Sequence, residues 1–324
     1  MDKKIIIGIA VAAAIAVIVP LAVIASTQSS TPAETADDSK VKVVASFFPL
    51  YDFARQVGGD RAEVASMIPA GVEPHDWEPT IRQIQEANSA DMVVYNGAGF
   101  ETWIERLEAN FTVNTSEGIE LVEIREEGHD EHEEEEEHEE GEDEHDHGGI
   151  DPHIWLDPIL AKQQVENIRA GLVQIDPENA QYYNDNAARL AAELDMLDAS
   201  IRSELSDCEH QDFIAFHNAF SYFADRYGLT QHSVHGGLPE GEVPPQRLQE
   251  IVDLANELKI DTIYSEELVD PRLAEVIADE IPNGQVLVLS PIEGLEEEEE
   301  QAGLGYIAKM EQNLANLKAG LKCR

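Results

Sequence analysis

Histidine and acidic side chains are the groups in this sequence best suited to chemistry. Eleven histidines are present, and five of them lie in an acidic run at residues 126–147 that also holds fifteen Asp or Glu residues. Such a run is expected to be a solvated, self-repelling loop in the absence of cations. Imidazoles interleaved with carboxylates also suit borderline metals, so the run predicts weak, auxiliary zinc capture by His129, His132, His138, His145 and His147.

Three further histidines lie after or between predicted strands, where loops gather at the carboxyl ends of a parallel sheet. They are His75, His153 and His217, and Glu266 follows the predicted strand at residues 262–264 in the same way. Three neutral imidazoles and one carboxylate would complete a tetrahedral zinc site. Spacing alone leaves the alternative of ordinary polar loop residues open, because no short metal motif joins any pair.

Strand and helix patterns alternate along the chain in two series, which is the rhythm of parallel sheets. The first series has strands at residues 42–47, 63–68, 92–96 and 119–124, with helices at 51–57 and 81–87 between them. The second has strands at residues 213–216, 231–234, 262–264 and 286–289. The sequence therefore predicts an α/β fold of two lobes, each a parallel sheet flanked by helices.

One long helix is predicted between the lobes, at residues 177–206. Asp176 can cap it, Pro177 suits its first position, and an apolar stripe follows at spacings of three and four. The stripe comprises Tyr183, Ala187, Leu190, Leu194, Leu197, Ile201 and Leu205. We expect a rigid linker between an N-terminal lobe at 41–176, which includes the acidic loop, and a C-terminal lobe at 207–324.

The start of the chain predicts export. Residues 5–25 are almost uninterruptedly apolar after a basic start, which favours a signal peptide or membrane anchor at 1–25 over a buried core helix. Residues 26–40 are polar and suit a disordered tether. An exported chain is extracytoplasmic, whether secreted or anchored. We also expect its two cysteines, Cys208 and Cys323, to form a disulfide, with two buried thiols as the alternative.

The net charge argues against one class of partner. The formal charge is −45, and residues 126–146 and 296–300 carry only part of it. A strongly acidic protein repels phosphate backbones, so nucleic acid is excluded as the expected partner.

Several separate motifs resemble the zinc and manganese solute-binding proteins of ABC importers, the TroA-like family, and most closely its zinc-binding ZnuA type. The resemblance covers nearly all of residues 41–323. It is carried by residues 47–53 (FFPLYDF), 74–80 (PHDWEPT), 96–101 (NGAGFE), 151–158 (DPHIWLDP), 216–222 (FHNAFSY) and 264–266 (YSE).

This resemblance implies a monomeric binding protein, not an enzyme, that holds a metal between its lobes and delivers it to a membrane permease. The family's ligand positions map onto His75, His153, His217 and Glu266, with Glu267 or water as alternatives for the fourth. Histidine at the third position and an acidic His-rich loop are typical of zinc members, and Mn²⁺ is the alternative ion. A surface adhesin and a zinc hydrolase, with an acid such as Glu267 activating water, are the competing functions.

Overall fold

Two four-stranded parallel sheets form the framework of the protein, in a computed structural model that describes residues 40–75, 77–123, 149–235 and 243–324. The first sheet has the order β2-β1-β3-β4. Its strands are β1 (Val41–Ala45), β2 (Ala62–Ser66), β3 (Met92–Tyr95) and β4 (Thr112–Asn114). The helices of this lobe are α1 (Phe48–Gly58), α2 (Ile81–Asn88) and α3 (Pro158–Ile175), with short 3₁₀ turns η1 (Gly59–Arg61), η2 (Ile104–Arg106) and η3 (Ile154–Leu156).

The second sheet repeats this topology with the order β6-β5-β7-β8, and all of its pairs are parallel. Its strands are β5 (Asp212–Ala215), β6 (Thr230–Ser233), β7 (Thr262–Ser265) and β8 (Gln285–Val288). The accompanying helices are α5 (Ser221–Tyr227), α6 (Pro245–Leu258), α7 (Arg272–Asp279), α8 (Glu297–Ala302) and α9 (Tyr306–Gly320). The predicted two-lobed α/β architecture is therefore confirmed.

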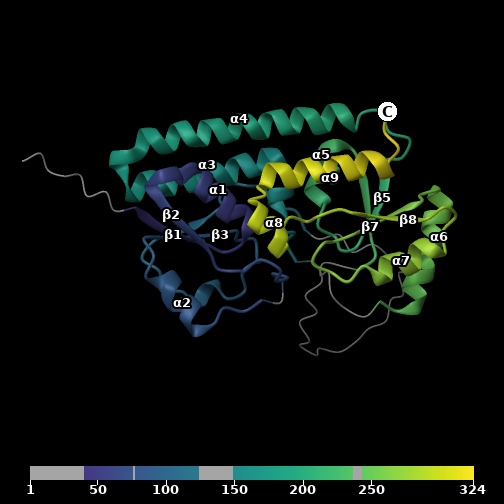
Figure 1. Cartoon of the computed structure of the whole chain (residues 1–324), viewed down its shortest axis with the longest axis horizontal. Helices are drawn as coiled ribbons and strands as arrows, with labels where there is room; N and C mark the ends of the chain where they lie inside the picture. The colour runs from purple at the N-terminus through teal and green to yellow at the C-terminus, as the bar shows by residue number, and fades with distance from the viewer. Residues whose placement is uncertain (1–39, 76, 124–148, 236–242) are drawn as a thin grey trace, which may run out of the picture. The chain divides into compact units, whose positions relative to one another are not determined.

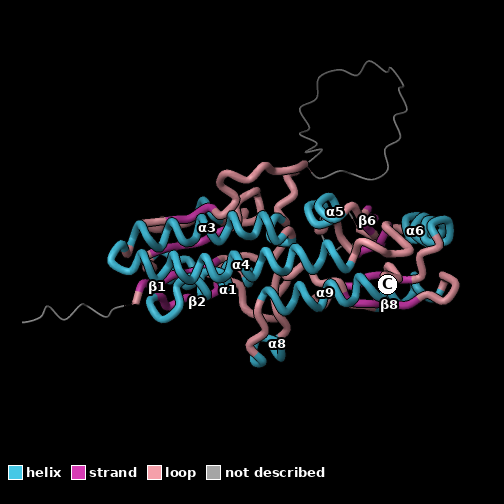
Figure 2. The backbone as a smooth tube through the Cα atoms, turned by 90° about the horizontal axis from the view of Figure 1, so that it is seen from above, coloured by secondary structure: helices cyan, strands magenta, loops and turns pink. Residues whose placement is uncertain are grey.

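A single long helix, α4 (Ala180–Glu204), runs alongside both lobes (Figure 1). Seen from above, it lies beside α1 and α3 at one end and reaches α9 at the other (Figure 2). The whole predicted apolar stripe from Tyr183 to Leu205 is buried. These side chains join residues of both lobes, such as Phe53 and Phe213, into one hydrophobic core, so α4 braces the lobes by packing as well as by covalent connection.

The start of α4 differs in detail from the prediction. Pro177 begins a 3₁₀ turn, η4 (Pro177–Asn179), and the α-helix proper starts at Ala180. The side chain of Asp176 accepts hydrogen bonds from Asn179 and from the Tyr183 hydroxyl, at 2.8 and 2.5 Å, so it anchors the turn through side chains. The lobe and linker boundaries given above stay a prediction.

One predicted strand is wrong. Residues 119–123 form no strand, and the fourth place in the first sheet belongs to β4, whose register with β3 pairs Val94 with Val113. Glu123 makes only an isolated antiparallel bridge with Ile150. Residues 112–114 form the edge strand because they follow β3 more closely in the sequence and bury Val113 against the core. The side chains at 119–123 are exposed or only partly buried.

The predicted disulfide between Cys208 and Cys323 is present and joins the chain after α4 to the chain after α9. The proposed signal or anchor at 1–25, nearly all of the tether at 26–40, and the histidines of the acidic loop lie outside the described residues. Among the residues that are described, no helix has the length and apolarity needed to cross a membrane.

Candidate metal centre

Four loops at the carboxyl ends of strands bring one side chain each to a common point. His75 lies between β2 and α2, and His153 directly precedes η3. His217 lies between β5 and α5, and Glu293 lies between β8 and α8. Two of the four therefore come from each lobe. This is the edge at which open parallel sheets bind ligands.

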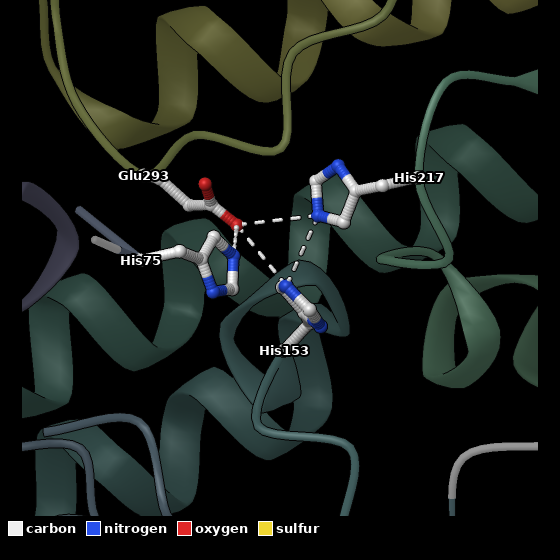
Figure 3. A group of neighbouring side chains, drawn as sticks. All are labelled: His75, His153, His217 and Glu293. Carbon is white, nitrogen blue, oxygen red and sulfur yellow. Dashed lines mark hydrogen bonds and ion pairs between the residues drawn. The ribbon is translucent and has the colours of Figure 1, made fainter. Parts of the chain in front are cut away.

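The four side chains point toward one another (Figure 3). One carboxylate oxygen of Glu293 lies 3.1 Å from His75 Nε2, 3.1 Å from His153 Nε2 and 3.5 Å from His217 Nε2. The Nε2 atoms of His153 and His217 are 3.3 Å apart. One possible ligand atom from each of the four residues lies within 4.8 Å of the other three.

The four separations between 3.1 and 3.5 Å are close to the edges of a tetrahedral zinc site. Ligand atoms at about 2.0–2.1 Å from a tetrahedral ion lie about 3.3–3.4 Å from one another. The group is also shielded from water, since His217 is fully buried and His75, the most accessible side chain, is only 10 % exposed. The cluster can thus enclose one small ion with four ligands.

Two buried carboxylates orient the rings of His153 and His217. Asp151 Oδ1 lies 2.7 Å from His153 Nδ1 and also accepts the backbone N–H of His153. Glu266 Oε1 lies 2.8 Å from His217 Nδ1 and accepts the backbone N–H of His217 at 3.2 Å. A carboxylate on Nδ1 holds a proton there and directs Nε2 toward the centre of the cluster, so Nε2 is the nitrogen that can bind a metal once it is deprotonated.

The charges of the cluster shift its protonation strongly. Burial opposes protonation of His153 and of His217, but the carboxylates beside them outweigh it and raise the pKa of both imidazoles, that of His217 well above its ordinary value. Burial would raise the pKa of Glu293, yet the three histidines hold it well below the usual range. Without a metal, the cluster therefore favours imidazolium and carboxylate, and a cation entering it competes with protons.

The structure brings together three of the four residues predicted from the sequence. Glu266 touches the back of His217 rather than entering the four-residue group, and Glu293 occupies the fourth position. Glu267 faces away, toward the Ser290 hydroxyl and Lys309.

Sequence reasoning missed both Glu293 and Asp151. The rule used for Glu266 would have applied equally to Glu293, because both follow strands of the second sheet. Nothing local in the sequence distinguishes the two, since the choice depends on how the loop after β8 folds back toward the first lobe.

Comparison with known proteins fits this geometry. Residues 43–320 match the family model described as "Zinc-uptake complex component A periplasmic". The chain is 41 % identical over 288 residues to the high-affinity zinc uptake system protein ZnuA of Bacillus subtilis, which covers 87 % of this chain and 88 % of the relative. This relative is named as a protein of a high-affinity zinc uptake system.

Solved structures agree with the fold. The Zn(II)-bound ZnuA-like domain of Streptococcus pneumoniae AdcA superposes with a TM-score of 0.72 at 32 % identity, covering 87 % of this chain and 99 % of that one. The laminin-binding protein Lmb of Streptococcus agalactiae, described as a bifunctional adhesin and metal transporter, gives 0.73 at 28 % identity, covering 88 % and 99 %. With three quarters or more of its length matched in every comparison, the chain belongs to the ZnuA family of zinc-uptake components.

Proposed function

We propose that this protein is the extracytoplasmic zinc-binding component of an ABC importer, which captures Zn²⁺ between its lobes and delivers it to a membrane permease. The observation that carries the proposal is the convergence of His75, His153, His217 and Glu293 on one buried point. The zinc-uptake role of the B. subtilis relative and the bound zinc in the AdcA domain support the same assignment.

The donor set favours zinc over manganese. Three imidazole nitrogens and one carboxylate oxygen suit a borderline ion in four-coordinate geometry, whereas Mn²⁺ prefers more oxygen donors and a larger coordination number. Four protein ligands also leave no open position for a reactive water, which a zinc hydrolase would need. The cluster therefore serves binding and release.

Capture and release have a physical basis in the same residues. At neutral pH the ion enters a site whose rings are already oriented by Asp151 and Glu266, so binding costs little side-chain conformational entropy. Two ligands come from each lobe, so a permease that separates the lobes slightly would remove half of the coordination shell. The acidic His-rich run at 126–147 would serve as an auxiliary, weaker zinc site.

The direct test is the metal content of protein purified without added metal, together with competition between zinc and manganese. We expect one tightly bound zinc and displacement of Mn²⁺ by Zn²⁺. Cells that lack the gene should lose high-affinity uptake of radioactive zinc and recover it with the wild-type chain. Preferential retention of Mn²⁺, or unchanged uptake in the deletion strain, would contradict the proposal.

Adhesion is a second candidate function, favoured by the similarity to the laminin-binding protein Lmb. Binding of the purified protein to immobilised laminin, with and without zinc, tests it separately from transport.

A further inference from the structure

The loop that carries Glu293 is held first from within its own lobe. The side chain of Asn313, on α9, accepts the backbone N–H of Ser290 at 2.8 Å and donates to the carbonyl of Ser290 at 2.6 Å. The Ser290 hydroxyl accepts the backbone N–H of Ile292 at 3.0 Å and donates to Glu267. The two Asn313 bonds fix Ser290, the second residue after β8, to α9.

The other lobe holds the same loop at two further points. The indole Nε1–H of Trp155 donates to the carbonyl of Pro291 at 2.7 Å, and the backbone N–H of Gly71 donates to the carbonyl of Leu295 at 2.7 Å. Trp155 is fully buried and lies two residues after His153. Glu293 is therefore flanked on both sides in sequence by hydrogen bonds that cross between the lobes.

The loop after β8 contains a residue in an unfavourable backbone conformation. Ile292 is fully buried and has φ of 58°, in the left-handed region that a β-branched residue enters only at a cost. Residues in such conformations persist when the surrounding structure holds them in place. The bonds around Ile292 supply that constraint, and the one nearest to it from the opposite lobe comes from Trp155.

We propose that Trp155 is a positioning residue for the metal site, whose indole N–H holds the loop after β8 so that the Glu293 carboxylate reaches the three histidines. The inference rests on the proposed function, because it assigns Glu293 as the fourth zinc ligand. An indole is a donor only, and the Pro291 carbonyl is buried. Removing the N–H leaves that carbonyl without this donor, and the strained backbone beside Glu293 is then free to relax.

One short segment, residues 153–155, would then contribute to the metal site in two ways. His153 binds the metal directly, and Trp155 sets the ligand that arrives from the opposite lobe. Because the Trp155–Pro291 bond crosses between the lobes, a separation of the lobes that removes Glu293 from the histidines would also break this bond.

A double-mutant cycle on the full chain tests the proposal, with Trp155→Phe, Glu293→Gln and the combined variant. Zinc affinity is measured by competition with a chromophoric chelator. We expect Trp155→Phe to raise the Kd about 10- to 100-fold, the range for loss of an outer-shell partner, and to have less than about a 3-fold effect in the Glu293→Gln background. The absorption spectrum of the Co²⁺ complex should change in the same way for the two single variants.

The matched control is Trp103→Phe, which makes the same chemical change at a buried tryptophan that packs against Trp77 in a separate apolar cluster. It should affect stability without altering the Kd or the Co²⁺ spectrum. If Trp155→Phe does not fold, benzothienylalanine at position 155 keeps the ring size and replaces the N–H by sulfur.

The outcomes separate the two hypotheses. Additive effects of Trp155→Phe and Glu293→Gln, or an unchanged Kd in Trp155→Phe, would overturn the positioning role while leaving the zinc site intact. An unchanged Kd in Glu293→Gln would instead remove Glu293 from the site, which is a failure of the proposed ligand set itself.

Discussion

The Nε2 atoms of His153 and His217 lie 3.3 Å apart, although 64 residues separate the two histidines and they belong to different lobes. Neither ring can leave this position freely, because each Nδ1 faces a buried carboxylate. Two imidazoles held this close with both Nε2 atoms directed inward are poorly explained by packing alone. They are well explained as two ligands of one ion.

Replacing His217 by alanine should lower zinc affinity by more than the about 10- to 100-fold that loss of an outer-shell partner costs. The substitution removes one of four ligands and leaves Glu266 without the ring it orients. Chelator competition at pH 7 measures the change. His232→Ala is the control and should bind zinc normally, because its ring faces Asp212, at the start of β5, and is not one of the four clustered residues. Full affinity in His217→Ala would remove this residue from the site.

Asp151→Asn should weaken zinc binding about 10-fold while leaving the three histidines in place. The neutral amide is a weaker acceptor for the Nδ1–H of His153, so the ring loses basicity and its fixed orientation. Asp91→Asn makes the same change at a carboxylate that accepts the backbone N–H of Lys42, at the N-terminal ends of β1 and β3. Equal Kd values for the two variants would show that Asp151 does not tune the metal site.

Zinc binding at pH 7 should release protons. The pKa values of His153 and His217 are raised by Asp151, Glu266 and Glu293 despite burial, so the metal-free rings hold protons above the ordinary imidazole value of about 6.5. Zinc binds only deprotonated Nε2 atoms. The apparent zinc affinity should therefore fall as the pH is lowered below the raised pKa values of the two rings. Calorimetry in two buffers of different ionisation enthalpy measures the release, and pH-independent binding would contradict the assignment.

Deleting residues 128–147 should leave one tight zinc site. Glu123 and Ile150, which flank the deleted stretch, form an antiparallel bridge. The described chain on its two sides is therefore already paired, and a short linker can replace the deleted residues. Titration should show loss of the weak sites and an unchanged highest affinity. Loss of the tight site in this variant would place the principal ligands in the acidic run.

Removing the disulfide with Cys208→Ser and Cys323→Ser should destabilise the metal-free protein without changing zinc affinity. The bond closes a loop with a sequence separation of 115, for which the chain-entropy model gives about 4–5 kcal/mol. Denaturant unfolding of the zinc-free protein measures the loss. A large change in Kd would indicate that the bond between the ends of α4 and α9 also sets the geometry of the cleft.

The sequence predicts those features that depend on periodic patterns. The stripe on α4 and the hydrophobic strands recur at fixed spacings, so both lobes and their linker could be expected in advance. The strand at residues 119–124 failed because edge pairing depends on which segment reaches β3, and sequence alone does not decide that. Glu293 was missed for a similar reason, since its position depends on contacts with Trp155 and Gly71 in the other lobe.

The composition of the zinc site can be measured by X-ray absorption at the zinc edge of the variant that lacks residues 128–147, loaded with one equivalent of zinc. This variant lacks the five histidines of the acidic run, so every imidazole signal must come from the remaining body. We expect four light-atom ligands at about 2.0 Å, three of them with imidazole scattering, and the loss of one imidazole in His217→Ala. A zinc ion with fewer than three imidazoles, or one whose shell is unchanged by His217→Ala, would contradict this expectation.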